Sequence, residues 1–162
     1  MLQKEQLLDK IKLIDGEQNR KEFKDNLIQI FQGMKDVATG FLKIAHAAEK
    51  IKEKRYYKEI GYTTFDIFCK DVLGLTRKTV YLYLRIDELL GKYPRLFDES
   101  FVTRIGSAKM DKLIVGINRI ENSALSPEIR TTKIEELVFS VDIKMSVGEI
   151  EDLVVKKTKS LR

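Results

Sequence analysis

The segment from Gly61 to Gly91, around which the predicted fold is organised, reads GYTTFDIFCKDVLGLTRKTVYLYLRIDELLG. It predicts a short helix, a tight turn and a second helix. Apolar residues spaced three and four positions apart give the first helix one buried face, formed by Phe65, Phe68, Cys69 and Val72. Gly74 follows them and suits the left-handed backbone that often ends a helix.

The second helix is predicted to begin at Thr76, whose hydroxyl can cap it, as Thr64 can cap the first helix. Leu75 can fill the gap between the two helices. The buried side of the second helix is predicted to hold Val80, Tyr83, Leu84 and Leu90, and the opposite side Arg77, Lys78, Tyr81, Leu82 and Arg85. This pattern is typical of a helix-turn-helix, in which the second helix enters the DNA major groove.

Candidate DNA contacts cluster at the start of the second helix, Thr76–Leu90, which we expect to read the groove. An arginine there can hydrogen-bond both acceptors of guanine, a pairing worth about 1–3 kcal/mol of discrimination. An ordinary helical hairpin with a solvated basic face is the alternative interpretation. The predicted DNA-binding residues are Thr76, Arg77, Lys78, Thr79, Tyr81, Leu82, Arg85, Lys54, Arg55, Lys58 and Lys109.

The charge distribution agrees with this interpretation. The 162 residues carry a net charge of +5, from 30 Lys/Arg and 25 Asp/Glu. Residues 50–95 hold 11 of the basic and 6 of the acidic residues, so the rest of the chain, with 19 of each, is neutral. A DNA-binding surface needs such a local excess, since phosphate contacts supply most non-specific affinity. Chance clustering on a lysine-rich chain is the alternative.

The sequence offers little support for catalysis, and we expect neither an enzyme nor a cofactor or metal site. It contains no Gly-rich phosphate loop and no cluster of metal ligands. Cys69, the only cysteine, falls on an apolar face and is interpreted as a core residue, with a reactive thiol as the alternative. His46, the only histidine, lies among alanines without an evident partner.

The remaining sequence predicts a nearly all-α protein. Residues 2–14 are expected to form a first helix. The longest helical stretch runs from Lys21 to Glu53 and carries an apolar stripe of Phe23, Leu27, Ile30, Phe31, Met34, Val37, Phe41, Leu42 and Ile44. Gly33 and Gly40 interrupt this stretch, so we expect a bend, a break or a close helix contact there.

The C-terminal part predicts further helices. A turn or short helix is expected at residues 96–101, and a helix capped by Ser107 follows. Ser126-Pro127 marks another helix start, since proline is tolerated at the first position, although residues 137–141 could instead be extended. Ser146 and Glu149 form a capping box for the last helix.

We expect two parts in this chain. Residues 1–49 form an N-terminal helical segment with a possible role in dimerisation, and residues 50–162 form the helix-turn-helix domain with its C-terminal helical extension. No apolar run approaches the roughly 20 residues that span a bilayer, and the N-terminus lacks the apolar segment of a signal peptide. We therefore expect a cytoplasmic protein, which the predicted DNA binding would associate with the nucleoid or a plasmid.

Residues 50–156 resemble a known family. The blocks YKEIGYTTFDIFC, LGLTRKTVYLYLR, VTRIGSAKMDKL and MSVGEIEDL occur in this order. Together they resemble the helix-turn-helix region of ParB/KorB-like plasmid partition and plasmid-maintenance proteins, most of all those of spirochaete type. The chain lacks the arginine-rich nucleotide-binding patch of the CTP-hydrolysing partition proteins.

The resemblance implies a homodimer that binds a repeated or palindromic site on double-stranded plasmid DNA, with a partition ATPase as a further candidate partner. It maps groove reading onto Arg77, Lys78, Leu82 and Tyr81. Leu82 in such a place favours apolar contact with a thymine methyl group. The alternative function is a helical protein–protein interaction or adaptor protein without direct DNA binding, whose partner surface is the stripe from Phe23 to Ile44.

Overall fold

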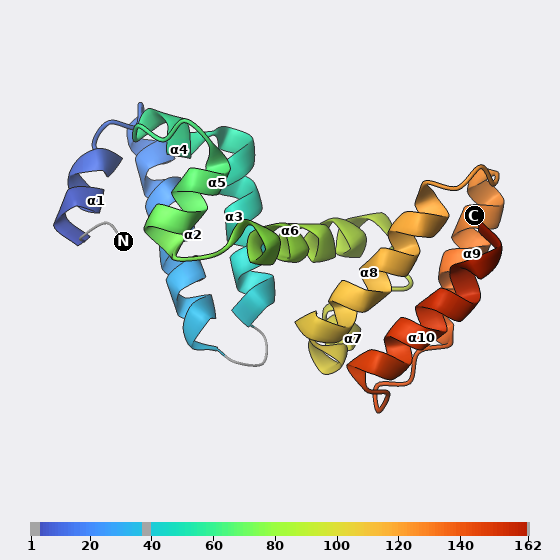
Figure 1. Cartoon of the computed structure of the whole chain (residues 1–162). Helices are drawn as coiled ribbons and strands as arrows, with labels where there is room; N and C mark the ends of the chain where they lie inside the picture. The colour runs from blue at the N-terminus through green and yellow to red at the C-terminus, as the bar shows by residue number, and fades with distance from the viewer. Residues whose placement is uncertain (1–3, 37–39, 162) are drawn as a thin grey trace. The chain divides into compact units, whose positions relative to one another are not determined.

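The computed structural model describes residues 4–36 and 40–161, and these form helices, turns and loops without a β-strand (Figure 1). The predicted all-α class is therefore confirmed. The chain divides into two compact units, residues 1–88 and 89–162. The helices of the first unit are α1 (Lys4–Ile11), α2 (Glu17–Lys35), α3 (Gly40–Lys54), α4 (Tyr56–Glu59), α5 (Phe65–Phe68), the π-helical turn η1 (Cys69–Leu73) and most of α6 (Arg77–Lys92).

The long helical stretch expected at residues 21–53 is broken into α2 and α3, which lie side by side in Figure 1. The two glycines make this contact possible. A Cβ atom on Gly33 would lie 2.6 Å from the carbonyl oxygen of Gly40, and a Cβ atom on Gly40 would overlap the carbonyl oxygen of Gly33. Of the alternatives left open by the sequence, the break and the close contact are both found.

The apolar stripe mostly faces the interior of the first unit. Phe23, Leu27, Ile30, Phe41 and Ile44 are buried, whereas other stripe residues, Phe31 and Met34, are each 38% exposed. Val37 and Leu2 lie outside the described residues. One continuous core joins α1–α4 to the helix-turn-helix stretch, from Ile11 to Leu84. This core crosses the expected boundary between residues 49 and 50.

Within residues 61–91, the short helix α5 continues into the π-helical turn η1, and a tight turn leads to the second helix, α6. The Thr64 hydroxyl accepts a hydrogen bond from the backbone N–H of Ile67 and caps α5. Gly74 ends the first helical segment with φ 67°, in the left-handed region where a side chain is strained. The Thr76 hydroxyl then accepts from the backbone N–H of Thr79 and caps α6. The predicted buried face is confirmed for Phe65, Phe68, Cys69 and Val72, and on α6 for Val80 and Leu84.

Cys69 lies inside this core with a free, buried side chain. Burial raises the pKa of its thiol to about 12, and the nearby Asp66 charge adds to the rise. In the unfolded chain the thiol is accessible, with a pKa near 8.5, and at pH 8 it forms far more of the reactive thiolate than the buried thiol does. We therefore expect alkylation of the native protein to be slower than that of the unfolded chain by about 1,000-fold or more. Timed iodoacetamide labelling with and without denaturant, followed by mass spectrometry, measures this ratio. Equal labelling rates would contradict the core assignment.

The second unit contains the end of α6 and five further helical segments: α7 (Glu99–Ile105), α8 (Ser107–Glu121), α9 (Pro127–Phe139), α10 (Val147–Thr158) and the 3₁₀ turn η2 (Lys159–Leu161). Helix α8 packs on α9 and α10, and Figure 1 shows α8 beside α10. Gly116 allows this packing, since a Cβ atom there would lie 2.8 Å from a methyl group of Leu137 and 3.0 Å from one of Val154.

The helix starts of this unit agree with the sequence at two places and differ at others. Ser126 caps α9 with Pro127 in its first turn, and Ser146 and Glu149 form the predicted capping box. Ser107 is instead the first residue of α8, and Gly106 takes the capping position without a side-chain hydrogen bond. Residues 137–139 are helical rather than extended. Among the described residues, none of the helices combines the length and apolar character that crossing a membrane requires.

Candidate nucleic-acid interface

The first turn of α6 carries exposed cations. Arg77 and Lys78 are exposed, and the first turn of this helix contains no acidic residue. The positive end of a helix dipole disfavours cations by about 0.3–1 kcal/mol each at the surface. The same end, with its unpaired backbone N–H groups, favours a bound anion. The sequence thus places two cations where an anionic partner offsets their cost.

Arg77 projects from this turn, with 75% of its side chain exposed. Its Nε lies 3.3 Å from Oδ2 of Asp66, which comes from α5. Its guanidinium carbon also lies 5.4 Å from the centre of the Tyr81 ring. An exposed ion pair contributes only about 0–1 kcal/mol, so this contact orients Arg77 without withdrawing it from an outside partner.

Tyr81 lies one turn further along α6 and is 38% exposed. Two cations lie close to its ring. The Nζ atom of Lys52, from α3, lies 5.3 Å from the ring centre, and the guanidinium carbon of Arg77 lies 5.4 Å from it. Burial raises the pKa of the Tyr81 phenol, and the neighbouring Asp66 carboxylate raises it further. Tyr81 therefore stays neutral near pH 7 and joins α3 to the exposed side of α6. Lys52 was not among the predicted DNA-binding residues.

The other predicted residues on α6 differ in accessibility. The hydroxyls of Thr76 and Thr79 lie 2.9 Å apart and share a hydrogen bond at the start of the helix. Thr76 is exposed, whereas Thr79 and Leu82 are partly buried. Tyr83 is partly buried on the core side, with its ring 5.8 Å from that of Phe41.

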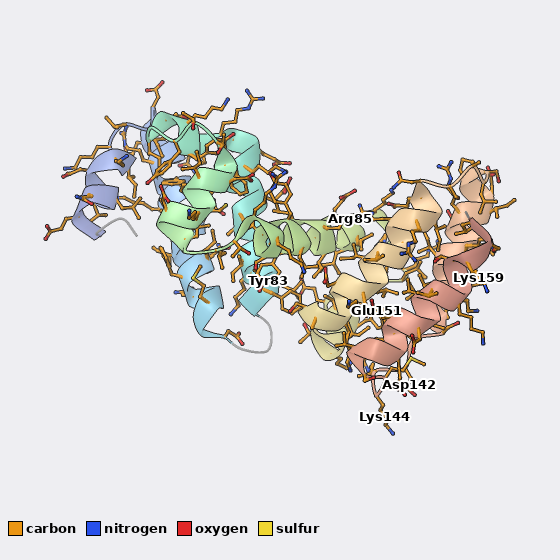
Figure 2. All side chains as sticks on the ribbon, viewed as in Figure 1. Tyr83, Arg85, Asp142, Lys144, Glu151 and Lys159 are labelled. Carbon is orange, nitrogen blue, oxygen red and sulfur yellow. The ribbon has the colours of Figure 1, made fainter. Side chains whose placement is uncertain are left out.

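Two predicted contacts are engaged within the protein. Only 17% of the Arg85 side chain is exposed, and its guanidinium lies 2.7 Å from the Glu88 carboxylate. Figure 2 shows Arg85 and Tyr83 on different sides of α6. In the second unit, Lys109 is partly buried and donates a 2.7 Å hydrogen bond to the carbonyl oxygen of Ile143, which ties α8 to the loop before α10. We therefore leave Arg85 and Lys109 out of the proposed interface.

The basic run before the helix-turn-helix lies at the junction of α3 and α4. Lys54 ends α3, Lys58 lies in α4, and both are exposed. Arg55 lies between the two helices with φ 56°, the one non-glycine residue with positive φ in the described part of the chain. The left-handed conformation costs about 1–2 kcal/mol for a residue with a Cβ atom. Arg55 therefore places a cation in a backbone conformation that glycine would adopt with less strain.

Replacing Arg55 by glycine is expected to stabilise the protein by about 0.5–1 kcal/mol, since relief of strain exceeds the added flexibility of the unfolded chain. Urea unfolding measures this gain. If the cation serves a phosphate contact, the same variant binds DNA more weakly. Arg55→Ala is the matched control, because it removes the charge and keeps the strain. A stability gain in Arg55→Ala equal to that in Arg55→Gly would contradict the assignment of strain.

The described residues present no group of three or more His, Cys, Asp and Glu side chains suited to hold a metal ion. His46 is exposed on α3, with its Nδ1 3.9 Å from the Asp87 carboxylate. That distance exceeds a hydrogen bond.

Comparisons with protein-family models, with curated proteins and with solved structures found no match for this chain. What the chain does is therefore inferred from its own residues.

Proposed function

We propose that this chain is a sequence-specific double-stranded DNA-binding protein that places the start of α6 in the major groove, as a helix-turn-helix does. The observation that carries the proposal is the exposed, acid-free first turn of α6 with Arg77 and Lys78. A core that includes Val80 and Leu84 anchors this helix, so that its first turn is held rigidly. Rigid presentation suits base reading because geometry then selects the base.

The resemblance to ParB/KorB-like proteins directs the proposal toward plasmid partition, replication control or transcription regulation. A homodimer on a palindromic site fits such roles, with half-sites about 34–36 Å apart along the duplex. A partition ATPase is the further proposed partner. Lys54, Arg55 and Lys58 serve in this proposal as phosphate contacts, which add affinity without sequence preference.

The adaptor alternative depends on the stripe from Phe23 to Ile44. Five members of that stripe are buried in the first unit, which leaves less apolar surface for a partner than the sequence suggests. We therefore place DNA binding first.

Selection from a random pool of duplex DNA tests the proposal. The full chain is expected to enrich one sequence motif, and its affinity for that motif is expected to fall steeply as salt rises from 50 to 200 mM, by about 10³-fold if it neutralises six phosphates. The mass of the complex then gives the number of chains per site. Recovery of unselected sequences with no retardation at low salt would contradict DNA binding and favour the adaptor function.

A further inference from the structure

The carboxylate that holds Arg77 has an unusual environment. Asp66 lies in the first turn of α5, and two-thirds of its side chain is buried. Its Oδ2 faces Arg77, while its Oδ1 is buried without a hydrogen-bond partner. A buried acceptor without a partner is costly. The carboxylate has a second neighbour in the Tyr81 phenol, whose pKa is raised by burial and by a hydrogen bond with Asp66, so Asp66 contacts both Arg77 and the tyrosine beside it. Packing around Oδ1 also means that the carboxylate cannot easily turn away from Arg77.

The contact with Asp66 uses one edge of the guanidinium. It is made through Nε, which leaves the two terminal nitrogens on the exposed end of a side chain that is 75% accessible. Those two nitrogens are the donors that an arginine presents to O6 and N7 of guanine. The Tyr81 ring lies 5.4 Å from the guanidinium carbon and provides a second contact. Arg77 is thus held from two sides while its donor fork stays open.

We propose that Asp66 is a positioning residue for DNA recognition, which holds the Arg77 guanidinium so that its terminal nitrogens meet a guanine. This inference rests on the proposed function and extends it to a residue that does not itself reach the DNA. An arginine fixed before binding loses less side-chain entropy in the complex. Asp66 also repels phosphate, so its charge favours the one geometry in which a base edge meets Arg77 and opposes non-specific contact.

The test compares base discrimination with general DNA affinity. The base pair read by Arg77 is first identified as the pair whose preference is lost in Arg77→Ala. Dissociation constants are then measured for the selected duplex, for the duplex changed at that pair and for an unrelated duplex. The variants are Asp66→Ala, Asp66→Asn and Asp71→Ala. Asp71→Ala is the matched control, because it removes another partly buried carboxylate, from the adjoining η1 turn. Thermal unfolding of each variant reports its folding.

Asp66→Ala is expected to reduce discrimination at the Arg77 base pair by about fivefold, which is the upper range for an exposed ion pair, while binding to the unrelated duplex is unchanged or tighter. Asp66→Asn is expected to fall between Asp66→Ala and the wild type, since its amide oxygen still accepts a hydrogen bond from Nε. Asp71→Ala is expected to retain full discrimination.

Three results would overturn the inference while DNA binding stands. In the first, Asp66→Ala retains the discrimination of the wild type. In the second, it weakens binding to all three duplexes equally, or unfolds at a lower temperature in step with its loss of binding, as a purely structural residue does. In the third, Arg77→Ala relaxes no base pair although the wild type selects a motif. A wild-type chain that binds no duplex would overturn the proposed function as well.

Discussion

Alanine at Gly33 is expected to destabilise the protein by about 3 kcal/mol or more, although alanine normally stabilises a helix interior by about 1 kcal/mol relative to glycine. The added Cβ atom would lie 2.6 Å from the carbonyl oxygen of Gly40 and 3.0 Å from a side-chain carbon of Ile44. The first of these is a backbone atom and cannot rotate away. Helices α2 and α3 must therefore separate, which exposes the core that both helices share with the helix-turn-helix. Urea unfolding of the full chain measures the loss.

Gly91→Ala provides the matched control, because Gly91 also lies in a helix, α6, and nothing lies within 4 Å of the place its Cβ atom would take. We expect this variant to be stabilised by a few tenths of a kcal/mol up to about 1 kcal/mol. Opposite signs at the two glycines separate contact from helix propensity. If Gly33→Ala and Gly91→Ala were both stabilising, the close α2–α3 contact would be wrong.

Arg77→Ala is expected to have the largest effect on DNA binding. If the Arg77 guanidinium contacts both acceptors of a guanine, as proposed, its loss removes about 1–3 kcal/mol of discrimination, which corresponds to about 5- to 150-fold at one base pair. Folding stability should change by no more than about 1 kcal/mol, since the Arg77 side chain is 75% exposed, although the side chain of its partner Asp66 is two-thirds buried. Titration of the selected duplex and of a duplex changed at that pair measures the effect.

Two lysine variants serve as controls for Arg77→Ala. Lys58→Ala removes a proposed phosphate contact and should weaken binding to all duplexes alike. The slope of the logarithm of the binding constant against the logarithm of the salt concentration should become shallower by about 1. Lys144→Ala removes a charge from the α9–α10 loop labelled in Figure 2 and should leave binding unchanged. If Arg77→Ala bound the selected duplex with unchanged affinity and base preference, while changes in the run from Lys54 to Lys58 abolished binding, the groove assignment to α6 would be wrong.

Local sequence signals account for much of the fold. Thr64, Thr76, Ser126 and Ser146 each cap a helix where the sequence places them. Gly74 adopts the expected left-handed backbone. These features depend on side chains and backbone groups within a few residues, so no knowledge of the tertiary structure is needed to recognise them.

Features that depend on distant contacts were less predictable. Gly33 and Gly40 left a bend, a break and close packing all open, because only the approach of α2 to α3 distinguishes them. The core shared by residues on both sides of position 49 had no local signal. Asp98 caps α7 through the backbone N–H of Phe101, a signal that was present in the sequence and was missed.

The candidate interface also combines features that the sequence predicts with features that depend on how the helices pack. Exposure of Arg77 and Lys78 followed from helix periodicity. The pairing of Arg85 with Glu88 was readable, since residues three apart on a helix are neighbours. The contact of Arg77 with Asp66 joins two helices across the turn, and that of Lys109 with the Ile143 carbonyl spans 34 positions. Neither has a sequence signal, because each depends on how separate helices pack.

Site-directed DNA cleavage tests the placement of α6 most directly. The native thiol of Cys69 is buried, so an introduced cysteine can be labelled selectively with an iron chelate that cuts nearby DNA strands. Lys78→Cys places the chelate on the first turn of α6, and Gln29→Cys places it on an exposed position of α2. With both labelled proteins shown to bind the selected duplex, we expect strand cuts within the motif from position 78 and background cutting from position 29. Cuts from position 29, with none from position 78, would contradict that placement of α6.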